Sequence, residues 1–153
     1  MKKLSKLFLL GVLVLPCLML YACGTMSVKG RDFEYDNSTV DFTGTGTANQ
    51  TALENEKQSL KDKYKDVSVK FADNGTVTFG SDQLYYTQDG SKITMFTDSE
   101  KKNAYTKFNG GDAQICVDGK NVKVTFVGNE ANNNANYKYT VNFKQVASDN
   151  TNK

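Results

Sequence analysis

The chain has 153 residues, of which 39% are hydrophobic and 24% charged, a size and composition that suit one domain with one core. It contains no histidine and three cysteines, which excludes Ser-His-Asp and Cys-His catalysis, His-ligated zinc and, once two cysteines are assigned below, a thiolate metal cluster. The formal net charge is +2, but removing Lys2, Lys3 and Lys6 from the 19 basic residues leaves 16 against 17 acidic ones, about −1, so no basic nucleic-acid-binding surface is expected.

The first segment has the order of a secretory signal. Its three lysines precede a nearly continuous apolar run from Leu7 to Leu20. That run is shorter than the roughly 18 to 20 residues of a membrane-spanning helix, and it contains Gly11 and Pro16. We therefore expect a cleaved export signal and not a permanent transmembrane anchor.

A cysteine follows the apolar run in a specific context. Leu20-Tyr21-Ala22-Cys23 resembles the bacterial lipobox, with a large apolar residue three positions before the cysteine and a small one directly before it. The resemblance implies that Cys23 receives a diacylglycerol and becomes the first residue of the mature protein. Two acyl chains give durable membrane attachment, whereas one gives marginal binding. The alternative is an ordinary signal followed by an incidental cysteine.

Beyond a short tether, the segment from residue 31 to 42 alternates as a half-buried strand does. Phe33 and Tyr35 share one parity, and Val40 and Phe42 share the other. A straight strand would place these pairs on opposite faces, so a bulge or turn is expected at 36–38.

Two other features of this region carry weak functional signals. Asp32, Glu34 and Asp36 form an acidic row, but they lack the loop and glycine of a known calcium site, so we interpret them as a solvated face. Gly44-Thr45-Gly46-Thr47 lacks the lysine of a phosphate-binding loop, so we interpret it as a linker.

One helix is predicted next. Thr51-Ala52-Leu53-Glu54 has the form of a capping box, which predicts a helix start at Thr51, and the helix should end near Asp66. Its apolar stripe is thin and can pack against one surface only. The stripe comprises Leu53, Lys57, Leu60 and Tyr64.

From Val67 onward the period is two, and turn residues set the hairpin registers. A three-residue loop with Gly75 left-handed pairs Phe71 with Val77 and Val69 with Phe79. Two-residue turns at Asp89-Gly90 and Asp118-Gly119 predict further pairs, namely Tyr86 with Ile93, Leu84 with Met95, Ile115 with Val122 and Ala113 with Val124. Phe108 is expected opposite Ala113 across a glycine-rich turn.

The last strands complete a mainly β fold. Tyr137, Tyr139, Val141 and Phe143 alternate inward with polar residues between them. Cys116 has outward parity, and with Cys17 removed and Cys23 lipidated it is the sole thiol of the domain, so no intrachain disulfide is possible. Eight or nine strands joined by tight turns predict an antiparallel up-and-down meander or closed barrel with one helix after the first strand.

The chain is similar in this organisation to small bacterial lipocalin-like lipoproteins of uncharacterised function. The similarity rests on Gly30-Arg31-Asp32-Phe33-Glu34-Tyr35, the Lys/Glu-rich helix, and the hairpin residues around Asn74-Gly75-Thr76 and Asp89-Gly90. The chain lacks the Gly-x-Trp signature of true lipocalins. Expected domains are a lipoprotein signal peptide at 1–22, a lipidated tether at 23–30, a lipocalin-like β domain at 31–146 and a disordered tail at 147–153.

The inward aromatic residues are the candidate ligand-lining set. Its members are Phe71, Phe79, Tyr86, Phe108, Phe126, Tyr137 and Tyr139. The competing interpretation is an ordinary core in which these rings pack on each other, since apolar stripes at strand spacing primarily indicate burial. The tyrosines are the most informative, because a buried phenol needs a hydrogen-bond partner in the protein, in water or in a ligand.

These observations predict a lipid-anchored, extracytoplasmic lipoprotein of the bacterial cell membrane or outer envelope, without catalytic residues, metal or cofactor. Its domain is expected to bind a small apolar ligand or an envelope partner. The alternative is a structural or accessory subunit of an envelope complex without a small-molecule ligand. Catalysis by a carboxylate pair is a third hypothesis, but nothing in the spacing selects a pair.

Overall fold

The computed structural model describes residues 26–106, 113–128 and 136–147. Within these ranges the chain forms eight strands and one helix. They are β1 (Arg31–Phe42), α1 (Gln50–Tyr64), β2 (Ser68–Phe71), β3 (Thr76–Phe79), β4 (Asp82–Asp89), β5 (Lys92–Phe96), β6 (Gln114–Asp118), β7 (Asn121–Val127) and β8 (Tyr137–Gln145). The expected Phe108 and most of the expected tail lie outside the described residues.

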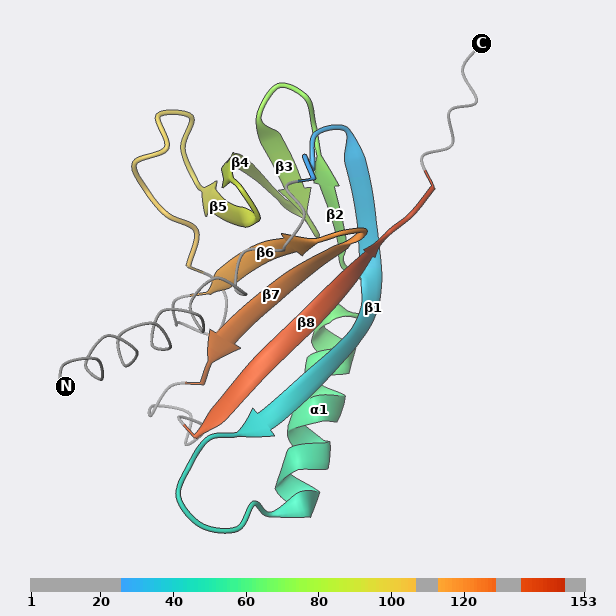
Figure 1. Cartoon of the computed structure of the whole chain (residues 1–153), viewed down its shortest axis with the longest axis vertical. Helices are drawn as coiled ribbons and strands as arrows, with labels where there is room; N and C mark the ends of the chain where they lie inside the picture. The colour runs from blue at the N-terminus through green and yellow to red at the C-terminus, as the bar shows by residue number, and fades with distance from the viewer. Residues whose placement is uncertain (1–25, 107–112, 129–135, 148–153) are drawn as a thin grey trace, which may run out of the picture.

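The eight strands close into an antiparallel barrel. Each strand pairs with its neighbour in sequence, and β8 returns to pair with β1. β1 and β8 run side by side along most of their length (Figure 1). The predicted up-and-down barrel with a helix after its first strand is confirmed, with eight strands and with β1 continuous from end to end.

The bulge expected near Asp36 is present. Tyr35 pairs with Phe143, whereas Asn37 pairs with Asn142, so Asp36 is an extra residue in the β1–β8 ladder. The extra residue reverses the parity of β1, and Ser38 therefore points inward, where it is buried and lies 3.0 Å from the Tyr35 hydroxyl (Oγ to Oη).

The β2–β3 hairpin has the predicted register. Phe71 pairs with Val77 and Val69 pairs with Phe79, around a loop in which Gly75 has φ +83°. A positive φ at this loop position strongly favours glycine.

The registers predicted for β4–β5 and β6–β7 are wrong by two residues. Tyr86 pairs with Met95, and Ile115 pairs with Val124. In both hairpins the aspartate is the last paired residue, and the glycine that follows it is the first residue of the two-residue loop. This glycine has φ +57° at Gly90 and +59° at Gly119. Because the shift is even, the same side chains point inward.

Helix α1 begins earlier than the capping box indicated. The N-cap is Asn49, whose Oδ1 accepts a hydrogen bond from the Ala52 N–H at 3.2 Å, so the predicted start at Thr51 is wrong. Asn is a better cap than Thr, and the helix ends at Tyr64, two residues before the expected end near Asp66.

Helix α1 covers the part of β1 that lies beyond β2. It packs against β1 (Figure 1), and its buried residues are Leu60 and Tyr64. Burial raises the pKa of Tyr64 to about 12. Lys57, which was expected on the apolar stripe, is exposed, and Glu56 is half-buried.

Replacing the observed cap should destabilise the protein, and replacing the predicted one should not. We expect Asn49→Ala to lower the free energy of unfolding by about 1 kcal/mol, because the first turn of α1 loses a hydrogen-bond acceptor. Thr51→Ala is the matched control and should change it by less than about 0.5 kcal/mol. Urea unfolding followed by circular dichroism measures both, and equal effects would contradict the cap assignment.

Candidate ligand groove at the N-terminal mouth of the barrel

The segment before β1 crosses the barrel mouth where the strands β1, β3, β5 and β7 begin. Val28 has 0% exposed area, and its N–H donates to Oε1 of Gln88 at 3.0 Å. The Gly30 N–H donates to the Phe71 carbonyl oxygen at 2.8 Å. The described part of the segment expected to be a tether is therefore docked on the barrel.

Gln88 holds this segment with both ends of its amide. Besides accepting from Val28, it donates from Nε2 to the carbonyl oxygens of Met26 and Gly90, each at 2.8 Å. Its position in β4 shares the inward parity of Leu84 and Tyr86. A glutamine here replaces the apolar side chain that the alternation would otherwise place at the rim.

Arg31 fixes the same segment from the other side of the mouth. Its guanidinium donates to the Ser27 carbonyl oxygen at 3.0 Å, to the Gly119 carbonyl oxygen at 3.0 Å and to Gln145 Oε1 at 2.6 Å. It also lies 5.1 Å from the centre of the Phe33 ring. Burial lowers the pKa of Arg31, which remains a cation at any physiological pH.

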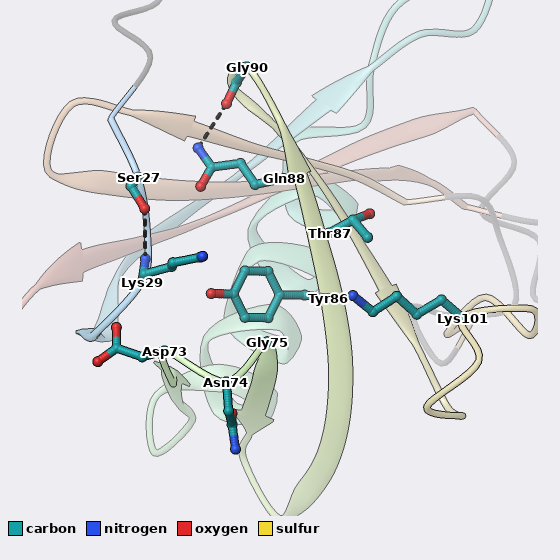
Figure 2. A pocket seen from close by; sticks show the side chains of 10 residues that line it. All are labelled: Ser27, Lys29, Asp73, Asn74, Gly75, Tyr86, Thr87, Gln88, Gly90 and Lys101. Carbon is teal, nitrogen blue, oxygen red and sulfur yellow. Dashed lines mark hydrogen bonds between the residues drawn. The ribbon is translucent and has the colours of Figure 1, made fainter.

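A surface groove of about 680 Å³ lies between the docked segment and the barrel rim. This volume is within the range of about 300 to 1,000 Å³ typical of small-molecule sites. The groove is shown in Figure 2. It is lined by Ser27, Lys29, Asp73, Asn74, Gly75, Tyr86, Thr87, Gln88, Gly90 and Lys101.

The groove combines two cations, one carboxylate and one aromatic ring. In Figure 2 the Lys29 side chain lies close to the Tyr86 ring, whereas the Lys101 side chain ends at the backbone of Tyr86 on the other side of β4. Among the described residues, neither lysine forms an ion pair. With Asp73 also present, the ionised side chains of the lining carry a net charge of about +1.

Tyr86 and the loop of Lys101 are both held in place. The Tyr86 hydroxyl donates to the Ala72 carbonyl oxygen at 3.2 Å, and its pKa is raised by burial and, less, by the Asp73 carboxylate. Lys101 has φ +59°, unusual for a side-chain-bearing residue. The Asp98 carboxylate holds this turn by accepting the N–H groups of Lys102 at 3.1 Å and Asn103 at 2.7 Å.

The candidate ligand-lining aromatics form contacting pairs inside the barrel. Phe71, Phe79, Tyr86, Phe126 and Tyr139 are buried, and Tyr137 is half-buried. The ring centres are 4.9 Å apart for Phe71 and Tyr86, 5.2 Å for Phe126 and Tyr139, and 6.5 Å for Tyr137 and Tyr139. Of the described set, Tyr86 also lines the groove. An apolar ligand among these rings stays a prediction.

A buried phenol at the other end of the barrel has a protein partner. The Tyr139 hydroxyl, on a side chain with 0% exposed area, donates to Glu56 Oε2 at 2.8 Å. This contact joins α1 to β8. A second, smaller groove of about 390 Å³ lies between the β1 bulge and α1, and Glu54, Lys57 and Lys61 are part of its lining.

The residues that build the larger groove were not identified from the sequence, except Tyr86. Lys29 was part of the presumed tether, and Lys101 belongs to a loop without a motif. The one usable signal was Gln88, a polar residue at an inward position of a strand. Such a residue must find hydrogen-bond partners, and here they come from the N-terminal segment.

No protein-family model, curated protein or solved structure matches this chain. Within the described ranges no helix is long and apolar enough to cross a membrane. The same ranges contain no cluster of three or more Cys, Asp or Glu residues arranged to hold a metal ion.

The Gln88 amide should control docking of the N-terminal segment. We expect Gln88→Leu to expose the peptide bond after Lys29, because two hydrogen bonds to the segment, of about 1 kcal/mol each, are lost. Tryptic cleavage there, followed by mass spectrometry, should accelerate roughly 30-fold. Gln83→Leu, at an exposed position of the same strand, is the control. Equal cleavage of both variants would show that Gln88 does not hold the segment.

Proposed function

We propose that this protein is a lipid-anchored, extracytoplasmic binding module of lipocalin-like architecture, attached to a bacterial membrane through Cys23. The observation that carries the proposal is the groove at the barrel mouth. One wall of this groove is formed by Ser27 and Lys29, which follow the proposed anchor residue Cys23 closely in the sequence. The barrel supplies a rigid rim, and the groove supplies an aromatic ring, amides, hydroxyls and charges. Such a mixture fixes the orientation of a ligand.

The groove supports a binding role better than the barrel interior does. A small apolar ligand inside would have to separate aromatic pairs that contact one another at ring-centre distances of 4.9 to 5.8 Å near Phe71. A ligand in the groove displaces no core contact. We therefore place the ligand against Tyr86 at the mouth. A non-catalytic role fits a chain without histidine.

Attachment through Cys23 is tested by substitution. We expect Cys23→Ala to release the protein from the membrane fraction and to block removal of the signal, because the thiol that accepts the lipid is gone. Cell fractionation and gel mobility measure both effects. Cys116→Ala, which alters the half-buried thiol on the outer wall, is the control and should remain membrane-bound. Retention of the Cys23→Ala protein with unchanged mobility would overturn the anchor.

Binding in the groove is tested by filling it. Native mass spectrometry of the mature protein extracted from membranes should show a non-covalent small-molecule adduct. We expect Thr87→Trp to remove the adduct, because Thr87 is exposed and lines the groove, whereas Gln83→Trp, exposed elsewhere on β4, should retain it. A stable protein complex without any small molecule would favour the accessory-subunit alternative. An adduct that survives Thr87→Trp would move the site away from the groove.

A further inference from the structure

The distance between the anchor and the barrel mouth is fixed by the chain. Only Gly24 and Thr25 separate Cys23 from Met26, whose carbonyl oxygen is held by Gln88. Three residue steps span at most about 11 Å when fully extended. If Cys23 is lipidated, as the proposed function requires, the mouth is held within that distance of the lipid headgroups.

The same geometry decides which end of the barrel faces the membrane. The docked segment enters at the mouth, and the β1–α1 loop lies at the opposite end (Figure 1). Met26, the first described residue, lies beside the mouth and is 48% exposed to solvent. An exposed methionine next to an acyl anchor suits the boundary between headgroups and acyl chains. The groove consequently opens at headgroup level.

The charges of the groove favour an anion. Lys29 and Lys101 come from segments far apart in sequence and line one groove, without an ion-pair partner among the described residues (Figure 2). Two like charges in one groove repel each other, and an anion placed between them relieves that repulsion. Asp73 offsets part of this field, and it also disfavours a multiply charged ligand.

Hydrogen-bond donors complete the site. Ser27 and Thr87, which carry hydroxyl groups, and Asn74 line the same groove. The Asn74 side-chain oxygen accepts from the Thr76 N–H at 3.1 Å and from its hydroxyl at 2.7 Å. These bonds fix the Asn74 side chain, whose NH₂ group points away from the Tyr86 ring (Figure 2), so we do not assign it to the ligand.

We propose that the groove binds the phosphate-bearing headgroup of an anionic lipid of the membrane that holds the anchor. Lys29 and Lys101 bind the phosphate, the Tyr86 ring forms the floor, and the polar donors contact the glycerol or sugar part of the headgroup. The acyl chains stay in the bilayer, which explains why a lipid site here needs no apolar tunnel. The inference extends the proposed function by naming the ligand class.

Photo-crosslinking in nanodiscs tests this directly. The mature lipidated protein carries a benzoylphenylalanine at Ala72, an exposed residue that adjoins the groove residue Asp73 without lining the groove itself, and a second preparation carries it at Thr47, in the β1–α1 loop. The discs contain phosphatidylglycerol and phosphatidylcholine in equal amounts, and mass spectrometry identifies the lipid adducts. From Ala72 we expect phosphatidylglycerol adducts enriched about fivefold to 25-fold over phosphatidylcholine, the contribution expected of one to two lysines at an anionic surface. From Thr47 we expect none.

Charge variants separate the groove from the general surface. Lys29→Gln with Lys101→Gln should abolish the enrichment, whereas Lys123→Gln with Lys138→Gln, two exposed lysines of the outer wall, should preserve it. Adducts in the input ratio, or equal labelling from Thr47, would overturn the inference. Loss of labelling with millimolar inorganic phosphate would assign the groove to free phosphate instead of lipid and would also overturn it. Failure to enter discs at all would contradict the anchor and is scored separately from adduct composition.

Discussion

Closure of the barrel depends on one strand that serves two neighbours. β1 pairs with β2 through its first residues and with β8 from Phe33 to Phe42, so it joins the beginning and the end of the chain. A strand of this length must coil to stay in a small barrel, and the bulge at Asp36 provides the extra twist. Without this ladder both β1 and β8 would present unpaired edges.

The rest of the architecture compensates for the unequal lengths of the strands. β2 and β3 are short, so the second half of β1 has a strand neighbour on one side only, and α1 packs there. The Tyr139 to Glu56 hydrogen bond places a charged acceptor of α1 against a fully buried phenol of β8. At the opposite end, the hydrogen bond from the Val28 N–H to the Gln88 side chain holds a short chain segment, in place of a helix, against the barrel. Both ends of the barrel are thus covered by elements outside the sheet.

The sequence predicted what depends on local periodicity and missed what depends on distant partners. Inward parity was right for β4 and β8 because one face of each strand must be apolar. The β4–β5 register was wrong because Asp-Gly fits two loop registers, and parity does not distinguish a shift of two. Asn49 was missed because Thr51 satisfies a stronger motif. The groove was beyond prediction, since only tertiary folding brings Lys29 and Lys101 to the same groove.

The ladder between β5 and β6 contains two residue pairs in the described structure, Lys92 with Cys116 and Ile93 with Ile115. Past these pairs the chain turns back on β5 instead, through a bridge between Phe96 and Ala104. Cooperative opening of a barrel starts where the fewest hydrogen bonds must break together. We consequently expect the amides of the β5–β6 seam to exchange with solvent through a smaller local opening than those of the longer ladders. Such an opening would give solvent access to the interior through the barrel wall instead of through either end.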